Sequence, residues 1–411
     1  MIPRLKPDLT LKEILALFKS NRKDDIEQYE LAFASLMGQS HAINFPYGRT
    51  GLIFLLKALG ILNQEIICPA YTCVVVPHAI VKSGNEPVFV DSSDYDFNAD
   101  WDQIEQATTD KTAALIVTSI FGHPANLDKL AEYKKRHPSV IILQDCAHSY
   151  AASWNGMSVQ RAGVAAIFGS NISKIITSIN GGMVTTDDAE LAKKLIQLRQ
   201  EHVTPPTLLN DIKRRVYLFA VWIAFSETVY GFVNAMERAG FLNKLTRYYD
   251  ENLINMPNDF LLGATATQGR VGKIQCQRYN KIIADRRKIA IYYHDHLQGI
   301  GDFILPPMIT GATYSHYVIR TAHRNELMSY ALNHGIQLGQ LIEYCIPEMA
   351  AYKHRPGSRI PCPVASSMAR ETINLPISIG GSIKKAAKIV KVLKSYASIQ
   401  DEKSNPCLQA Q

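Results

Sequence analysis

The sequence has few cysteines, no long hydrophobic run and neither of the common nucleotide-binding motifs. Its seven cysteines are scattered and form no C-x-x-C pair, so neither a disulfide framework nor a metal site is expected, and reduced thiols in the cytoplasm fit best. The longest apolar run, Val216–Phe225, is shorter than the roughly 18 residues of a membrane span. The N-terminus lacks the apolar core of a signal peptide. Without a G-x-G-x-x-G or Walker pattern, dinucleotide and P-loop interpretations lose support.

The chain is long and only mildly basic. Its 411 residues predict two to three domains at roughly 150 residues each. A content of 47% hydrophobic and 20% charged residues is typical of a globular protein with a large core. The net charge of +7 suits phosphate-bearing ligands but gives little support for nucleic acid. We therefore expect small-molecule substrates and no nucleic-acid partner.

Short apolar runs alternate with amphipathic stretches through the first two-thirds of the chain. Near-continuous apolar runs are typical of strands buried on both faces. Seven are predicted as strands: His41–Phe45, Glu65–Cys68, Pro87–Asp91, Ala114–Thr118, Val140–Asp145, Ala165–Gly169 and Gly182–Thr186. Helices are predicted over Thr50–Leu59, Asn126–Arg136 and Asp187–Arg199. This alternation predicts an α/β fold with a mostly parallel sheet wrapped by helices.

The pattern changes after residue 200. Pro205 and Pro206 interrupt the chain, and a helical insertion is expected over residues 205–250. Asn280–Leu297 is predicted as a long helix with a charged face. The remainder, Thr313–Ala397, predicts a small α+β domain with a strand over Tyr317–Arg320 and helices over Asn325–His334 and Ser382–Tyr396. We predict a large domain over 1–255, a small domain over 256–400 and a flexible tail over 401–411.

Three local features carry candidate chemistry, and each is weak alone. Asp145 ends an apolar strand, where α/β sheets bind ligands, although a helix cap is the commoner role for such a residue. Lys174 follows 29 positions later in a loop rich in Ser, Asn and Gly, where a solvated lysine is the ordinary interpretation. Gly48, Arg49 and Thr50 join a strand to a helix, and a helix N-terminus can hold phosphate.

In combination these features resemble the fold type I pyridoxal-phosphate enzymes, and more closely the DegT/StrS family of sugar aminotransferases. The shared order is a phosphate cradle, an Asp at a strand end, a later Lys and a Gly-Gly pair. The matching segments cover most of the chain: EIICPAYTCVVVPHAI, PVFVDSSDYDFNAD, IFGHPANLDKLAE, IILQDCAHSYAASWNG, SKIITSINGGMVTTDDAELAKKLIQLRQEH, DRRKIAIYYHDHL, SHYVIRTAHRNELMSYALNHGI and INLPIS.

The resemblance implies pyridoxal 5′-phosphate as the cofactor and assigns roles to individual residues. Lys174 falls on the lysine that binds the cofactor covalently and then acts as the general base. Asp145 falls on the carboxylate that keeps the ring nitrogen protonated, and His148 falls on the Gln or His that contacts the ring or its phenolic oxygen. The implied phosphate cradle is Gly48, Arg49 and Thr50.

Two departures from the family pattern affect the cofactor site. Gly169 stands where the family has a phosphate-binding serine, so that role passes to Ser170, Asn171 or Ser173. At the position of the ring-stacking aromatic the chain has Cys73. Either Tyr71 covers the ring from a shifted position or no residue does.

Two further segments bear on the partner subunit and the substrate. Asn258-Asp259-Phe260 resembles an N-Y-R segment that reaches a neighbouring subunit's site, and the retained Asn258 predicts a homodimer in which it contacts the partner's cofactor phosphate. The alternative is an ordinary turn asparagine. Glu343-Tyr344-Cys345 replaces the family's substrate-side H-Y-P, which leaves the acceptor open.

The leading interpretation is an aminotransferase that moves an amino group from an amino-acid donor, glutamate by resemblance, to a keto sugar that is linked to a nucleotide. A sugar dehydratase is one alternative, but such relatives replace the lysine with histidine. An aminotransferase for a lipid-linked or non-sugar ketone is another. A non-catalytic regulatory relative is a third, and the joint retention of Asp145, His148 and Lys174 argues against it.

A basic triplet, Lys213-Arg214-Arg215, directly precedes the apolar run 216–225. Read as a helix, this run is apolar all round, and burial in the core or a dimer interface is the favoured interpretation. The alternative places 213–225 in a membrane interface, with the three cations on anionic headgroups. That alternative predicts a cytoplasmic protein with peripheral membrane contact.

Overall fold

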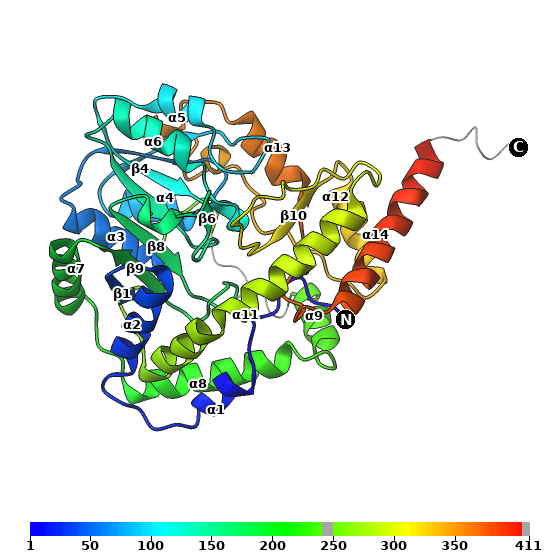
Figure 1. Cartoon of the computed structure of the whole chain (residues 1–411), viewed down its shortest axis with the longest axis horizontal. Coiled ribbons are helices and arrows are strands. Elements are labelled where there is room, and N and C mark those ends of the chain that lie inside the picture. The colour runs from blue at the N-terminus through cyan, green and yellow to red at the C-terminus, as the bar shows by residue number, and fades with distance from the viewer. Residues whose placement is uncertain (241–249, 405–411) are drawn as a thin grey trace, which may run out of the picture.

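The computed structural model describes residues 1–240 and 250–404 and contains a seven-stranded sheet with helices on both faces (Figure 1). Across the sheet the order is β1 (His41–Phe45), β9 (Gly182–Thr186), β8 (Ala165–Gly169), β5 (Ile141–Asp145), β4 (Thr112–Thr118), β2 (Glu65–Pro69) and β3 (Glu86–Val90). β9 pairs antiparallel with β1 and β8, and the remaining pairs in this sheet are parallel. The predicted α/β fold with a mostly parallel sheet is confirmed.

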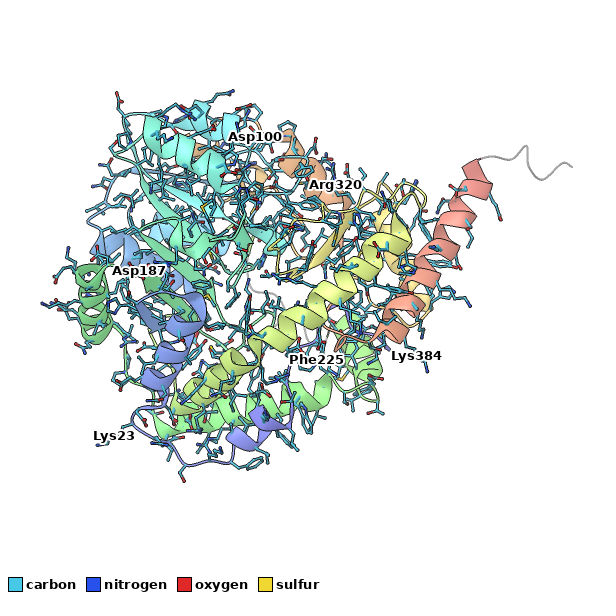
Figure 2. All side chains as sticks on the ribbon, viewed as in Figure 1. Lys23, Asp100, Asp187, Phe225, Arg320 and Lys384 are labelled. Atoms are coloured by element: carbon cyan, nitrogen blue, oxygen red, sulfur yellow. The ribbon has the colours of Figure 1, made fainter. Side chains whose placement is uncertain are left out.

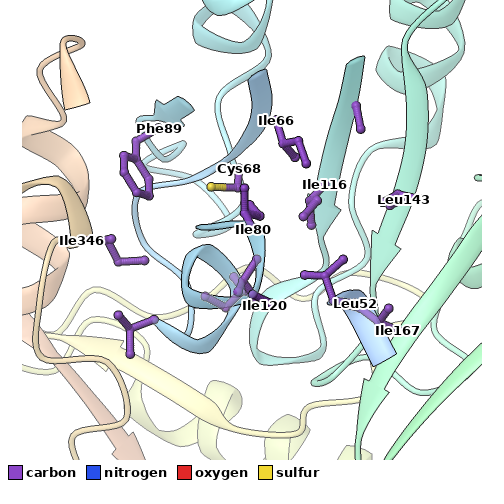
Figure 3. Close-up of a cluster of buried hydrophobic side chains, with 14 of the residues drawn as sticks. Leu52, Ile66, Cys68, Ile80, Phe89, Ile116, Ile120, Leu143, Ile167 and Ile346 are labelled. Atoms are coloured by element: carbon purple, nitrogen blue, oxygen red, sulfur yellow. The ribbon is translucent and has the colours of Figure 1, made fainter. Parts of the chain in front are cut away.

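The sheet separates two hydrophobic cores, and side chains fill the space between it and the helices (Figure 2). On β2, Ile66 and Cys68 belong to one core and Ile67 to the other, because successive side chains of a strand point to opposite faces. The first core (Figure 3) lies against α3 (Gly48–Ala58), α4 (Val75–Lys82) and α7 (Ala189–His202). The second lies against α2 (Asp25–Met37), α5 (Trp101–Ala107) and α6 (Leu127–Arg136). Burial on both faces explains the unbroken apolar runs of the strands.

A smaller α+β unit follows the long helix α11 (Ala266–Leu297). It contains the antiparallel pair β10 (Tyr317–Arg320) and β11 (Thr372–Leu375), with α12 (Arg324–Asn333) and α14 (Ile383–Ser404). The first half of α11 packs on α2, and its last turns enter the core of the small unit (Figure 1). α11 therefore joins the two units as one continuous strut.

Residues 346–371 connect the small unit to the large sheet a second time. They form η3 (Ile346–Glu348), η4 (Pro356–Ser358) and α13 (Pro363–Glu371). The backbone N–H groups of Val364 and Ala365 donate to the Asp91 carboxylate at 3.0 and 2.8 Å. This carboxylate at the N-terminus of α13 fixes that helix to the end of β3.

The predicted insertion contains α8 (Leu208–Ala224) and α9 (Tyr230–Arg238). α8 lies at the lower edge of Figure 1 beside α1 (Leu11–Ala16). Residues 241–249 of the insertion and 405–411 of the predicted tail lie outside the described residues. The first part of that tail, residues 401–404, is helical, because α14 continues through Ser404. In the part of the chain that is described, no helix combines the length and apolar character needed to cross a membrane.

Candidate active site

The two residues that the sequence analysis placed 29 positions apart come together at one edge of the sheet. Asp145 is the last residue of β5, and Lys174 lies in the loop that joins β8 to β9. β5 and β8 are adjacent and parallel, so both residues lie at the carboxyl edge, where α/β sheets bind ligands. Each residue's charge affects the pKa of the other.

Asp145 is a buried carboxylate, with only 4% of its surface exposed. The backbone N–H of Ala147 donates to it at 3.0 Å. Burial raises its pKa, and the Ala147 N–H and the charge of Lys174 oppose that rise. A carboxylate in such a position is costly unless a cation or hydrogen-bond donor compensates it. A protonated ring nitrogen is a group of that kind.

Lys174 is half-buried. Burial of its amine lowers its pKa, while the charges of Cys73 and Asp145 act in the opposite direction. A lowered pKa increases the fraction of neutral amine, which is the form that attacks a carbonyl carbon or accepts a proton. Gly169, at the end of β8, lies against the lysine side chain, since a Cβ at that position would make an ordinary van der Waals contact with Cε of Lys174 at 3.5 Å.

His148 is held in one orientation and one tautomer. Its ring stacks on Phe121 with centroids 6.0 Å apart and planes at 12°, and the backbone N–H of Phe121 donates to Nδ1 at 3.3 Å. Burial, and then the charges of Lys174 and His316, lower the pKa of His148 well below its ordinary value. The ring is therefore neutral, with Nδ1 as acceptor and the proton on Nε2. An Nε2–H group is the donor that a phenolic oxygen needs.

The loop that presents Phe121 also brings the two units of the fold into contact. Phe121 has φ of 55°, a left-handed conformation that is uncommon for a bulky residue. At Gly122 a Cβ would lie only 2.6–2.8 Å from Thr313 Oγ1 and from the backbone nitrogens of Tyr314 and Ser315. Glycine is therefore required here for the close approach of the small unit.

A second histidine, His316, enters the site from that neighbouring segment, and the sequence analysis did not single it out. Its ring centroid lies 5.2 Å from that of His148, and its Nδ1 is 3.1 Å from the Ser315 hydroxyl. Its Nε2 is buried without a hydrogen-bond partner within residues 1–240 and 250–404. Such an orphaned nitrogen fits a bound polar group. The sequence signal for it was the polar pair Ser315-His316 directly before the strand Tyr317–Arg320.

The N-terminus of α3 lies against the Gly181–Gly182 pair. A Cβ on Gly182 would lie 2.2 Å from the backbone nitrogen of Gly48, so the glycine is needed for this close backbone approach. The first-turn N–H groups of α3 have no acceptor within the helix and are available to an anion. The N-terminus of α3, a kind of site where phosphate can bind, therefore lies close to the loop that carries Lys174.

The side chains of the cradle make contacts of their own. The Arg49 guanidinium lies 5.8 Å from the Tyr47 ring centre, and the Thr50 hydroxyl donates to the Phe260 carbonyl at 2.8 Å. The Tyr47 hydroxyl donates to Asp259 at 2.6 Å. These contacts direct the Thr50 side chain away from the role of phosphate donor and leave the backbone N–H groups of the cradle for that role.

The three alternatives to the missing serine differ in their surroundings. Ser170 is 1% exposed, and its hydroxyl lies 2.8 Å from that of Ser178. Asn171 is exposed, and its side-chain oxygen accepts from the N–H and hydroxyl of Ser173 at 3.0 and 2.6 Å. Ser170 is engaged in the packing of the loop, so Asn171 and Ser173 are the more accessible candidates.

Tyr71 and Cys73 occupy different parts of the site. The Tyr71 hydroxyl lies 2.8 Å from Thr372 Oγ1 and donates to the Ile342 carbonyl at 3.3 Å, so its end is fixed to the small unit. Cys73 is partly exposed and close enough to Lys174 to influence its pKa. The structure thus brings Cys73, rather than Tyr71, next to the lysine.

Asn258 lies on the outer side of the cradle. Its side chain is exposed, and the next residue, Asp259, forms a 3.0 Å ion pair with Arg214. The predicted contact of Asn258 with a partner subunit remains a prediction. An exposed position beside the phosphate cradle is compatible with such a contact.

The fold and the arrangement of Asp145, Lys174 and His148 define an enzyme of the fold type I aminotransferase class, which depends on pyridoxal phosphate. The chain belongs to the DegT/DnrJ/EryC1/StrS aminotransferase family, whose sequence profile matches residues 10–208 and 232–394. The resemblance drawn from the sequence is therefore confirmed.

Several known proteins resemble the chain. GDP-perosamine synthase of Caulobacter vibrioides is 27% identical over 285 residues, which cover 69% of this chain and 65% of that enzyme. The dTDP-3-amino-3,6-dideoxy-alpha-D-galactopyranose transaminase of Aneurinibacillus thermoaerophilus is 25% identical over 90% of both chains. The crystal structure of S. venezuelae DesV, 23% identical, covers 96% of this chain and 99% of its own with a TM-score of 0.75, which supports the fold.

Proposed function

We propose that the protein transfers an amino group from an amino-acid donor, glutamate, to a keto sugar that is linked to a nucleotide. The meeting of Asp145, Lys174 and His148 at the carboxyl edge of the sheet carries this proposal. The relatives that act on GDP- and dTDP-linked sugars support the acceptor class.

Each residue has a distinct task in this reaction. The bound cofactor supplies an electron sink for the carbanion at the donor's Cα. The Asp145 carboxylate holds a proton on the ring nitrogen, and the Nε2–H of His148 donates to the phenolic oxygen. Lys174, with its lowered pKa, removes the Cα proton and returns it to the cofactor carbon. The first-turn N–H groups of α3 hold the phosphate.

The donor half-reaction tests the role of Lys174. Wild-type enzyme incubated with glutamate should lose the yellow absorbance of its lysine-bound cofactor and release 2-oxoglutarate. Lys174→Ala should lose at least about a thousandfold of this rate, because both covalent binding and base catalysis depend on that amine. Lys193→Ala, a change of an exposed lysine on α7, is the matched control. Borohydride trapping with peptide mapping must find the cofactor on Lys174, and label on a different lysine rejects the assignment.

The acceptor is identified by mass spectrometry after the donor half-reaction. Keto sugars on nucleotides, keto sugars on lipid carriers and non-sugar ketones are offered separately. Amination of nucleotide-linked sugars alone supports the proposal, and preference for either other class overturns the acceptor assignment while leaving the aminotransferase assignment intact. Tyr344, in the altered substrate-side segment, accepts a hydrogen bond from the Val74 N–H at 3.0 Å, so this segment lies next to Cys73.

We also propose a homodimer in which Asn258 reaches the partner's cofactor phosphate. Its exposed position beside the cradle supports this assignment. Mixing Asn258→Ala with Lys174→Ala should restore up to about a quarter of wild-type activity, because random pairing gives half mixed dimers and each has one intact site. Lack of recovery, with mixed dimers demonstrated by mass spectrometry, rejects the shared site.

A cytoplasmic location is part of the same proposal. The six cysteines in the described residues are all free, and five of them are buried. Free thiols are typical of proteins in a reducing compartment.

A further inference from the structure

Exposed apolar side chains gather on two neighbouring helices. Of the 24 large apolar side chains that are well exposed in the described chain, twelve lie between residues 11 and 18 or between 208 and 232. α1 packs beside α8, since Arg215 donates to the Leu17 carbonyl at 2.6 Å and Leu17 and Leu218 share a small core. We call the exposed apolar surface of these helices the α1–α8 face: Leu11, Leu15, Phe18, Leu208, Leu209, Ile212, Val216, Phe219 and Ile223.

The residues of this face follow helical spacing. Along α8, five of the eight large exposed apolar side chains recur at intervals of four, four, three and four residues, which places them in one stripe: Leu208, Ile212, Val216, Phe219 and Ile223. Leu209 lies beside this stripe, and Tyr217 and Trp222 flank it. Leu11 and Leu15 on α1 and Phe18 just after it recur at intervals of four and then three residues. The opposite side of α8 carries the buried Asp211, Leu218 and Val221. The helix therefore has an apolar outer stripe in addition to its buried inner side. The core of the single chain does not bury this run, and its burial in a dimer interface stays a prediction.

Exposed charge on these two helices is of one sign. The two acids, Glu13 and Asp211, are buried and ion-paired with arginines. Lys12, Lys19 and Lys213 are exposed. In Figure 2, Lys23 marks one end of the edge along which α8 lies, and Phe225, at the C-terminal end of α8, marks the other end. Lysines therefore flank the apolar stripe without intervening exposed acids on α1 or α8.

Two of the three cations in the basic triplet have another role. Arg214 pairs with Asp259 at 3.0 Å, and Arg215 pairs with Asp211 at 2.8 Å. Both point toward the body of the protein, so the expectation that all three cations are available to headgroups is wrong for these two. Lys213 keeps that role, joined by the lysines near α1.

A cavity of about 230 Å³ adjoins the C-terminal half of α8. Its lining includes one cation, Lys6, and is otherwise mainly apolar, with Pro7, Leu9, Val221, Trp222 and Phe225 among the residues. An apolar recess with a lysine among its lining residues matches an acyl chain beneath an anionic headgroup.

The family profile matches only part of this surface. It leaves residues 209–231 unmatched, which contain most of α8, whereas α1 lies within the matched residues 10–208. Most of the stripe on α8 therefore lies outside the part of the chain that the profile covers.

We propose that the α1–α8 face binds the surface of an anionic lipid bilayer, with the stripe at the acyl boundary and Lys12, Lys19 and Lys213 on the headgroups. Charge complementarity selects this occupant. A second copy docked through the same patch would bring lysines against lysines across a two-fold axis, whereas an anionic bilayer attracts them. α8 lies in the plane of such a surface, as interfacial amphipathic helices do.

Co-sedimentation of the full-length, cofactor-loaded protein with vesicles tests the proposal. Phosphatidylcholine vesicles with and without phosphatidylserine are compared at low and high salt. Binding should require phosphatidylserine and weaken with salt, because headgroup attraction is screened. Lys213→Glu should weaken binding by at least about fivefold, the contribution of one cation near an anionic surface. Val216→Ser should weaken it about tenfold through lost apolar burial.

The matched controls make the same types of substitution at exposed sites away from the α1–α8 face. Leu62→Ser changes an exposed apolar residue in the α3–β2 connection, and Lys111→Glu changes an exposed lysine before β4. Both should bind like wild type. Protein that stays in the supernatant with phosphatidylserine vesicles overturns the proposal, as do losses that are equal in variants and controls. Sedimentation velocity that shows a Val216-dependent oligomer without vesicle binding assigns the face to a second copy instead. Lys213 is exposed, so its variant remains informative if Val216→Ser fails to fold.

Discussion

The carboxyl edge of the sheet and the α1–α8 face depart from the usual distribution of polar and apolar groups in opposite directions. At the edge of the sheet, Asp145, His148 and His316 are buried, although charged and polar groups normally stay in water. On α8, Leu208 is 68% exposed and Val216 is 63% exposed, although such side chains normally contribute to a core. Both arrangements make the folded state of the isolated chain less stable than a usual distribution would. Each therefore indicates a contact with a molecule outside the chain.

The two regions differ in how they relate to the family. The buried polar site falls within the residues that the family profile matches, whereas most of α8 does not. The site is thus the shared part of the molecule, and its chemistry is the chemistry of the class. If α8 contacts a bilayer as we propose, the two regions should respond independently to mutation.

The largest effect is expected when the buried charge of the shared site is removed. Asp145→Asn should lower the transamination rate by about two to four orders of magnitude, because a neutral ring nitrogen stabilises the carbanion poorly. Single-turnover kinetics with glutamate measure this loss. Asp188→Asn, which changes an exposed helix cap, is the control, and near-normal turnover in Asp145→Asn contradicts the assigned role.

The same variant should gain stability when the cofactor is removed. Burial raises the pKa of Asp145, so the folded state disfavours its charged form, and the contribution present below the ordinary carboxyl pKa is lost as the pH rises. At neutral pH, cofactor-free Asp145→Asn should melt about 2–4 °C above wild type, the shift that ~1 kcal/mol produces in a large chain. The gap should close under acidic conditions, and a lower Tm at neutral pH contradicts this account.

A smaller effect is expected at His148, where two substitutions separate the role of the flat ring from the role of the N–H donor. His148→Gln keeps an N–H donor and should retain most activity, whereas His148→Phe should lose about 10–100-fold through the missing hydrogen bond. Because the pKa of wild-type His148 is lowered well below its ordinary value, the difference between the variants should be constant between pH 6 and 8. A difference that titrates across this range indicates a charged His148 and contradicts the assigned tautomer.

Much of the fold was predictable because its signals are local. The predicted strands over residues 41–45, 165–169 and 182–186 coincide with the observed ones, since burial on both faces leaves unbroken apolar runs. The long helix was predicted only from Asn280, whereas α11 starts at Ala266. Its first half contains Gly269 and Gly272, where a Cβ would lie 2.5 Å from Asp25 O and from the Tyr29 ring. Close packing on α2 thus replaces the amphipathic pattern there.

The site was predictable only where the family resemblance reached. Asp145, His148 and Lys174 are brought together as expected, but His316 depends on the docking of the small unit, which no local pattern encodes. The sequence did not predict the orientation of the Arg214 and Arg215 side chains either. Their partners, Asp259 and Asp211, are 45 and four residues away, and sequence alone does not indicate which face of α8 is turned inward.

The anchoring of α8 should matter for stability more than for chemistry. Burial alone would raise the pKa of Asp211, but hydrogen bonds from Thr267, Thr265 and Asn21 lower it to about 2. Its stabilising contribution is therefore present above the ordinary carboxyl pKa and is lost as the pH falls toward 2. Asp211→Ala should cost about 1–3 kcal/mol at neutral pH, measured by urea unfolding, and the deficit should shrink in acid. A deficit that does not depend on pH excludes the charge as its origin.

The smallest effect is expected on the outer stripe of the same helix. Val216 is 63% exposed, so Val216→Ser removes little packing and should change the free energy of unfolding by less than about 0.5 kcal/mol. Leu218→Ser, two positions away and fully buried, should instead cost about 2–5 kcal/mol. If the stripe were a seam between two copies of the chain, Val216→Ser would lower Tm strongly and would weaken the rise of Tm with protein concentration relative to wild type, because association stabilises the folded state by mass action. Thermal melts of wild type and both variants over a wide range of protein concentration distinguish these cases. A Val216→Ser melt that matches wild type at every concentration leaves the stripe exposed in solution, as contact with a bilayer requires.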